Sequence, residues 1–110
     1  MSSKYSFKFT PLAEEDIGSA LVYISQKLFN VKAADDLFAK IENAITHICE
    51  FPYSFADCSY FLINDLNIRH ANIDNYVLVY EVLEDAKQIN VLRFVYAKMD
   101  LSRLNIKDKV

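Results

Sequence analysis

The chain has 110 residues, of which 53% are hydrophobic, 14% aromatic and 25% charged. This length suits one domain with one core, and this composition excludes an intrinsically disordered chain. The formal charge of −3 argues against a protein that grips nucleic acid mainly through phosphates, since that requires a surplus of Lys and Arg. We therefore expect a single domain over residues 1–110, with its core at about 4–96 and a C-terminal tail over 97–110.

The first residues, MSSKYSFKF, are polar and alternating rather than an apolar run of secretory length, so no signal peptide is predicted. No stretch is long and apolar enough to span a membrane. The two cysteines, Cys49 and Cys58, are expected to be free thiols in a cytoplasmic protein. Two Cys and two His without ligand spacing predict no metal site, and nothing in the sequence calls for a cofactor.

The N-terminal half reads as one strand followed by two helices. Residues 4–9 alternate in polarity, which predicts a half-buried strand. Thr10 and Pro11 then form a helix start, and helical spacing continues to about residue 29. Asn30 is expected to cap a second helix over about 31–50. The expected buried stripes are Ala13, Ile17, Ala20, Leu21, Ile24 and Leu28 in the first helix, and Ala34, Leu37, Phe38, Ile41, Ala44, Ile45 and Ile48 in the second.

The C-terminal half reads as three strands. Phe51-Pro52 ends the second helix, because a residue before proline is disfavoured in the helical region. An irregular, aromatic connection over 53–65 follows, and then strands at about 66–71, 76–83 and 88–96 with short polar separators. The order β-α-α-β-β-β predicts an α+β fold in two layers, with a helical hairpin on one face of an antiparallel sheet.

At this level of detail the chain resembles the RelE/ParE toxins of bacterial type II toxin–antitoxin systems. The resemblance lies in the string FTPLAEEDI at the first helix, the string EFP at 50–52, and Arg69 shortly before NYVLVYEV. The strand VLRFVY and the closing Met99-Asp100 complete the set, which covers about residues 4–104. Each string is mostly hydrophobic patterning, and the specificity lies in their order.

The resemblance implies a growth-inhibiting toxin of a plasmid-stabilisation-like system that a cognate antitoxin neutralises. A homodimer and a heterotetramer with the antitoxin both fit it. RelE-like members cleave mRNA in the ribosome, whereas ParE-like members poison DNA gyrase by binding. The fold is common to both branches and does not decide between them.

For a RelE-like endoribonuclease without a metal, the chemistry needs several cations together with a general acid or base. The candidates in this chain are Arg69, His70, Lys98 and Arg103. The resemblance also implies an arginine directly after the tyrosine of the middle strand, but Val77 follows Tyr76 here. Arg69 and His70 are neighbours in a strand and should point to opposite faces, so they are poorly placed to act together.

For a ParE-like protein, the candidate contacts with the target or the antitoxin are Arg69, Arg93, Tyr96, Lys98 and Arg103. Arg69 and Arg93 are expected to bridge carboxylates such as Glu81 across strands, to form a small cationic patch, or both. The aromatic group of Phe51, Tyr53, Phe55, Tyr60 and Phe61 is expected to plug one end of the core, and any exposed part of it would be a groove for an antitoxin helix.

Three functional hypotheses follow: a gyrase poison that acts by binding, a ribosome-dependent endoribonuclease, and a weakened toxin that retains antitoxin binding. The absent arginine after Tyr76 and the acidic charge favour the first, and therefore a protein that is not an enzyme.

Overall fold

The protein is described by a computed structural model that covers residues 5–57 and 67–97. The element order agrees with the predicted β-α-α-β-β-β, with one additional short strand, β2, inside the connection that was expected to be irregular. The elements are β1 (Ser6–Phe9), α1 (Pro11–Val22), the π-helical segment η1 (Tyr23–Lys27), α2 (Val31–Glu50), β2 (Ala56–Asp57), β3 (Ile68–Ile73), β4 (Tyr76–Leu83) and β5 (Gln88–Tyr96).

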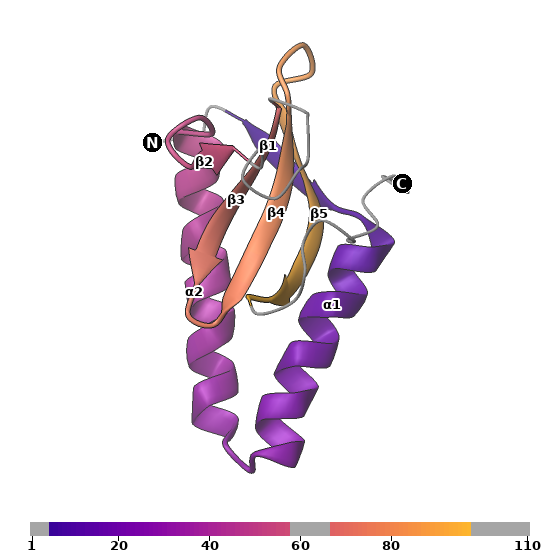
Figure 1. The fold of residues 1–110 in the computed structure, drawn as a ribbon, viewed down its shortest axis with the longest axis vertical. Helices are drawn as coiled ribbons and strands as arrows, with labels where there is room; N and C mark the ends of the chain where they lie inside the picture. Colours follow the sequence, from indigo (N-terminus) through magenta and orange to yellow (C-terminus); the bar gives the residue numbers. More distant parts are fainter. Residues whose placement is uncertain (1–4, 58–66, 98–110) are drawn as a thin grey trace.

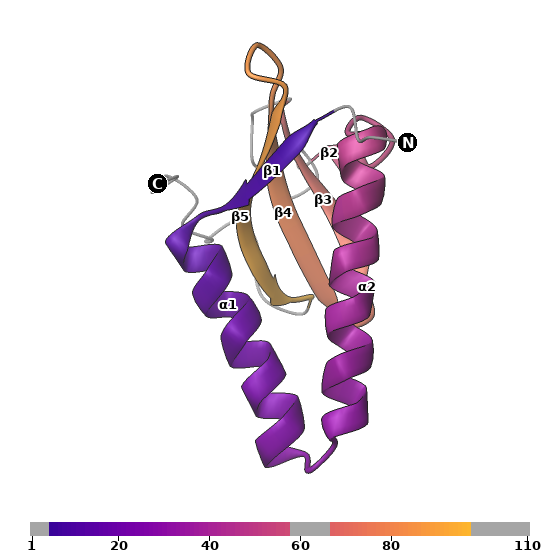
Figure 2. The ribbon, with the colours of Figure 1, turned by 180° about the vertical axis from the view of Figure 1, so that it is seen from behind.

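The strands form one five-stranded sheet in the order β1-β5-β4-β3-β2. Both helices cover the same face of this sheet and diverge from the short link that joins them (Figures 1 and 2). The meander β3-β4-β5 is antiparallel as predicted, but β1 pairs with β5 in parallel, so the sheet is mixed rather than wholly antiparallel. A register shift lies between Val79 and Tyr80, because Val79 pairs with Arg93 and Tyr80 with Val91.

The start of α1 also covers the free edge of β5. The Thr10 hydroxyl accepts a hydrogen bond from the Ala13 backbone N–H at 3.1 Å and donates one to the Leu92 carbonyl at 2.9 Å. The Thr10 N–H donates to the carbonyl of Val91 at 3.0 Å. The predicted cap is therefore confirmed, and the same side chain also satisfies an edge carbonyl that β1 is too short to reach.

The first helix does not run as a regular α-helix to residue 29, as the periodicity suggested. Its last turns widen into η1, where the Leu28 N–H donates to the Tyr23 carbonyl at 3.2 Å. Phe29 then adopts a left-handed backbone conformation, with φ of 51°. A π-helical turn is rare in proteins and is frequently found at functional sites.

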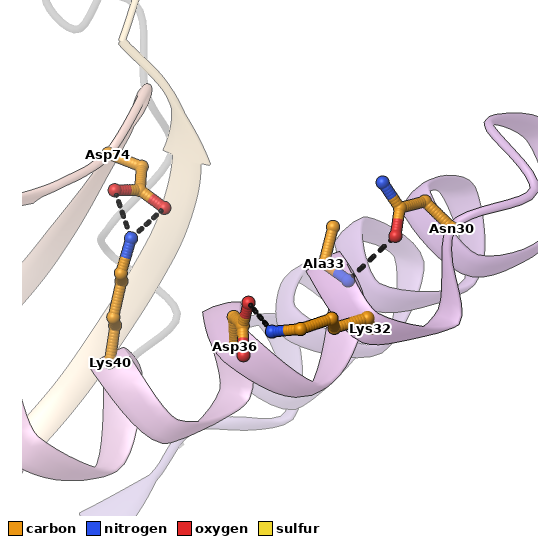
Figure 3. A network of polar contacts seen from close by, with 6 residues as sticks. All are labelled: Asn30, Lys32, Ala33, Asp36, Lys40 and Asp74. Atoms are coloured by element: carbon orange, nitrogen blue, oxygen red, sulfur yellow. Dashed lines mark hydrogen bonds and ion pairs between the residues drawn. The ribbon is translucent and has the colours of Figure 1, made fainter.

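Helix α2 has the predicted bounds because local signals define both of its ends. The Asn30 side chain accepts from the Ala33 N–H at 2.9 Å, and Pro52 follows shortly after its last residue. On its exposed side, Lys32 pairs with Asp36, and Lys40 contacts both oxygens of Asp74 at 2.8 and 3.1 Å (Figure 3). The Lys40–Asp74 pair joins the helix to the β3–β4 turn.

The core lies between the helices and the sheet. Its members include Leu37, Ile41, Ile45, Ile48, Leu78, Tyr80, Ile89, Val91 and Phe94. Two residues of the predicted stripes are not buried: Phe38 is 47% exposed and Leu28 is 55% exposed. Phe38 lines an open groove beside α1 and β1, and Leu28 lines a pocket beside Tyr76 and Tyr96, so neither side chain is covered.

Cys49 is buried and free, and burial raises the pKa of its thiol. Cys58 lies outside the described residues. Within residues 5–57 and 67–97, no helix combines the length and apolarity needed to cross a bilayer.

Candidate functional site

Arg69, the main candidate from the sequence, binds its own chain. Its Nη1 donates to the Phe55 carbonyl at 2.6 Å and to the Tyr53 carbonyl at 3.4 Å, and its guanidinium carbon lies 5.0 Å from the centre of the Tyr53 ring. On the adjacent strand, the buried Tyr80 hydroxyl donates to the Pro52 carbonyl at 2.7 Å. Both side chains therefore fasten the segment that follows α2 to the sheet.

Arg93 is paired inside the protein as well. Its Nε lies 2.7 Å from Oδ2 of Asp16 and its Nη2 lies 3.1 Å from Oδ1, which is the two-pronged geometry typical of strong arginine–carboxylate pairs. The hydrogen bonds that Arg93 donates to Asp16 raise the pKa of Arg93, and each side chain is 16% exposed. A carboxylate partner for Arg93 is thus supplied by α1. Arg93 is held in the fold by this pair, and its contact role stays a prediction.

The two arginines do not form one cationic patch. Arg69 is opposite Tyr80, while Arg93 is opposite Val79, and adjacent residues of a strand face opposite sides. Since Tyr80 belongs to the core beneath the helices, Arg69 lies on the helix-covered face and Arg93 on the other. The expected patch is therefore corrected.

His70 lies on the face opposite to Arg69, as the alternation predicts. It is paired with Val79, which is itself paired with Arg93. The structure thus brings His70 and Arg93, both half-buried, to one row across three strands, with Val79 between them. Of the residues proposed for RNA cleavage, Lys98 and Arg103 lie outside the described residues.

A polar cluster that sequence reasoning missed joins the β4–β5 turn to the N-terminus. One oxygen of Glu84 accepts from the Tyr5 and Tyr53 hydroxyls, each at 2.8 Å, and the other accepts from Lys87. The donors Lys87, Tyr53 and Tyr5 lower the pKa of Glu84 to about 2. Because Tyr53 also lies beneath Arg69, the cluster is continuous with the Arg69 contacts. Residues this distant in sequence gave no common signal.

A groove of about 430 Å³ opens between α1, α2 and β1. The side chains that line the groove are mostly apolar, and its acidic lining residues are Glu14 and Glu42. Gly18, the only glycine of the chain, lines the groove. A Cβ added to Gly18 would meet no heavy atom within 4 Å, so α1 leaves free space in the groove at this position. The apolar lining consists of Phe7, Phe9, Ile17, Phe38, Ile41 and Ile45.

The structure describes three members of the predicted aromatic plug, which are Phe51, Tyr53 and Phe55. Phe55 packs edge-on against Tyr80, with ring centres 6.3 Å apart, whereas Phe51 is 55% exposed. Tyr60 and Phe61 lie outside the described residues. In the part of the chain that the structure describes, an apolar groove that a helix could enter lies between α1, α2 and β1.

Tyr96 is 45% exposed and lines a second pocket, of about 550 Å³, at the other end of the sheet. The other lining residues are Tyr23, Ile24, Leu28, Asn75 and Tyr76. The rings of Tyr76 and Tyr96 meet edge-on with centres 5.8 Å apart, and Tyr76 stacks on Phe94 at 4.8 Å. Burial raises the pKa of the Tyr76 hydroxyl, as do the nearby hydroxyls of Tyr96 and Tyr23. Alternation along β4 puts Tyr76 on the same face as Leu78 and Tyr80, but it cannot show that η1 brings Tyr23 alongside.

A strand, a helical hairpin and an antiparallel meander with the first strand added at its edge is the architecture of RelE/ParE-like toxins. Residues 7–101 match the family described as the ParE toxin of the type II toxin–antitoxin system parDE, and the chain belongs to this family. It is the toxin component of such a system, and its partner is an antitoxin.

A solved structure described as the chromosomal ParDE TA system from P. aeruginosa has the same fold. It aligns with a TM-score of 0.68 and 16% sequence identity, over 88% of this chain and 100% of that one. No curated protein matches the chain.

Proposed function

We propose that this toxin inhibits DNA gyrase by binding it, without cutting RNA. The observation that carries the proposal is at Val77, where a RelE-like nuclease would have an arginine. Val77 is 3% exposed and lies within the row of apolar side chains in β4. A cation at that position would have to be buried in the sheet, which is costly without a partner.

The arginines of the described strands add support. Arg69 donates hydrogen bonds to backbone carbonyl groups of its own chain, and Arg93 forms an ion pair with Asp16. Cleavage of RNA without a metal relies on cations that are available to the phosphate. A binding mechanism needs no such set. Contacts from Tyr96, Lys98 and Arg103 to the target remain part of the proposal.

We place the antitoxin in the groove between α1 and α2. An amphipathic helix buries its apolar side in such a groove and reads it through residues at helical spacing. Glu14 and Glu42 favour an antitoxin segment that carries Lys or Arg beside its apolar residues. Both partners of such a system act in the cytoplasm. Whether the toxin is a homodimer or forms a heterotetramer with the antitoxin is testable by light scattering on the purified complex.

The second candidate function is ribosome-dependent mRNA cleavage, and the row of His70 and Arg93 on one sheet face favours it. Imidazole is a side chain that can serve as a general acid or base in catalysis. In the third candidate, a weakened toxin, the groove retains antitoxin binding and neither target is inhibited.

The test is induction of the toxin alone in a bacterial host, with pulse labelling of DNA and protein synthesis over the first minutes. Early arrest of DNA synthesis, together with inhibition of supercoiling by purified gyrase in vitro, is the expected result. Early arrest of translation with fragmented mRNA would establish the nuclease. His70→Gln would then abolish it, whereas the same substitution leaves a gyrase poison active. Arrest of neither process would indicate the weakened toxin.

A further inference from the structure

The pocket lined by Tyr23, Tyr76 and Tyr96 is built from two distant parts of the chain. Tyr76 and Tyr96 are paired across β4 and β5 on the helix-covered face, and Tyr23 is the first residue of η1. We refer to it as the tyrosine pocket. Its volume, about 550 Å³, is within the usual range of ligand sites.

The polar groups of the tyrosine pocket are unused within the part of the chain that the structure describes. The hydroxyls of Tyr23, Tyr76 and Tyr96 have no hydrogen-bond partner there, whereas those of Tyr5, Tyr53 and Tyr80 each have one. Tyrosine at a buried or half-buried position usually finds a partner for its hydroxyl. Tyr23 and Tyr96 are 53% and 45% exposed, so these hydroxyls are open to solvent or to a bound ligand.

The ring faces point to the charge of the missing partner. In the described residues, Tyr53 and Tyr5 each have a cation over the ring, from Arg69 at 5.0 Å and Lys87 at 5.2 Å. The lining that the described residues give the tyrosine pocket contains no charged side chain. The faces of aromatic rings attract cations, and a group of them forms a cage for one.

The surroundings indicate that a protein brings this cation. Leu28, which lines the pocket, is 55% exposed, and nearby positions in the sequence also carry exposed apolar side chains: Val22 at 52%, Phe29 at 90% and Val31 at 64%. An apolar rim around an anchor pocket is the anatomy of a protein interface. Single-stranded nucleic acid would also stack on tyrosines, but its phosphates need Lys or Arg, and the described lining supplies none.

We propose that the tyrosine pocket receives an arginine side chain from a protein partner, in a segment where apolar residues flank that arginine. A guanidinium suits the site better than an ammonium, because it is weakly hydrated, stacks on aromatic faces and directs several donors to acceptors in one plane. The three hydroxyl oxygens and the Asn75 side-chain oxygen supply the acceptors. The proposal does not depend on gyrase being the target, since it concerns the chemistry of the bound segment.

The test uses the purified toxin and two capped tripeptides, isoleucine–arginine–leucine and the same peptide with citrulline, which has nearly the shape of arginine but no charge. Binding is followed by NMR of isotope-labelled protein. We expect shifts of the Tyr23, Tyr76 and Tyr96 rings, and binding of the arginine peptide about fivefold or more tighter than that of the citrulline peptide.

Substitutions assign this preference to the rings. Tyr23→Leu is at an exposed position and should abolish the preference for arginine, whereas Tyr23→Phe keeps the ring and should retain most of it. Phe7→Leu, in the groove between the helices, is the matched control and should change nothing. Equal binding of both peptides would mean that the pocket is only an apolar contact, and shifts elsewhere or none would overturn the proposal.

Discussion

Asp16 and Arg93 join α1 to β5 through a two-pronged ion pair, and Oδ2 of Asp16 also accepts the Phe94 backbone N–H at 3.0 Å. β1 pairs with β5 only as far as Val91, so this carboxylate serves the part of the edge strand that β1 does not cover. The pair therefore has two functions in the fold: it neutralises a half-buried guanidinium and it satisfies an edge donor.

We expect Asp16→Ala to lower the free energy of unfolding by about 2–4 kcal/mol, because it leaves the Arg93 charge and the Phe94 N–H without this partner. Asp16→Asn should cost less, since its side-chain oxygen can still accept from Phe94. The double variant Asp16→Ala/Arg93→Met should recover part of the loss. Urea unfolding of the three variants checks this, and an unchanged midpoint for Asp16→Ala would show that the pair is not stabilising.

Arg69→Met should lower the free energy of unfolding by about 1–3 kcal/mol, because a charged donor is lost from the Tyr53 and Phe55 carbonyls. Tyr80→Phe is the matched variant: it loosens the same segment at Pro52 by about 1 kcal/mol without changing the charge. Growth inhibition by the two variants then separates the roles of Arg69. If both keep their toxicity, Arg69 is structural; if Arg69→Met alone loses it, the arginine contacts the target.

Much of the fold could be predicted because its signals are local. Asn30 and Pro52 define α2, Thr10 and Pro11 define the start of α1, and alternation defines the strands of the meander. The predicted site fared differently, since the partners of its arginines are decided by packing. Arg93 meets Asp16 from 77 positions away, and no pattern along the chain encodes that contact.

The surfaces also depend on helix direction, which periodicity does not report. Phe38 has the spacing of a buried residue and is nevertheless half exposed, because it lines the open groove between α1, α2 and β1. The π-turn at Tyr23 has no sequence signature of its own, although it helps to build the tyrosine pocket. Local chemistry thus predicts which residues face inward, and only the packed structure shows which inward positions remain open.

The Glu84 cluster predicts a specific acid dependence of stability. The pKa of Glu84 is about 2 in the folded protein and 4.5 ordinarily, so the carboxylate contributes stability above about pH 4.5. This contribution should decline as the pH falls from 4.5 and disappear near pH 2. The difference in unfolding midpoint between the wild type and Glu84→Gln, measured from pH 7 to pH 2, should follow that course. A difference independent of pH would mean that the charge of Glu84 does not matter.

Gly18 offers the sharpest test of the groove between the helices. Gly18→Leu should fill the groove and weaken antitoxin binding at least about tenfold, because a new side chain at this open position occupies the space of the antitoxin. Gly18→Ala is the matched control: it should stabilise α1 by about 0.5–1 kcal/mol and leave most of the groove open. Both variants should fold, since a Cβ here meets no atom within 4 Å.

In cells, Gly18→Leu should be a toxin that co-expressed antitoxin no longer neutralises, while Gly18→Ala remains neutralised. The Phe38→Glu toxin should likewise escape neutralisation by the antitoxin. The substitution puts a charge into the apolar lining of the groove and adds to the negative charge of Glu14 and Glu42. Phe51→Glu changes an equally exposed phenylalanine outside the groove and should remain neutralised. Calorimetric titration with the antitoxin supplies the affinities. Wild-type affinity for Gly18→Leu and Phe38→Glu would show that the antitoxin binds elsewhere on the toxin.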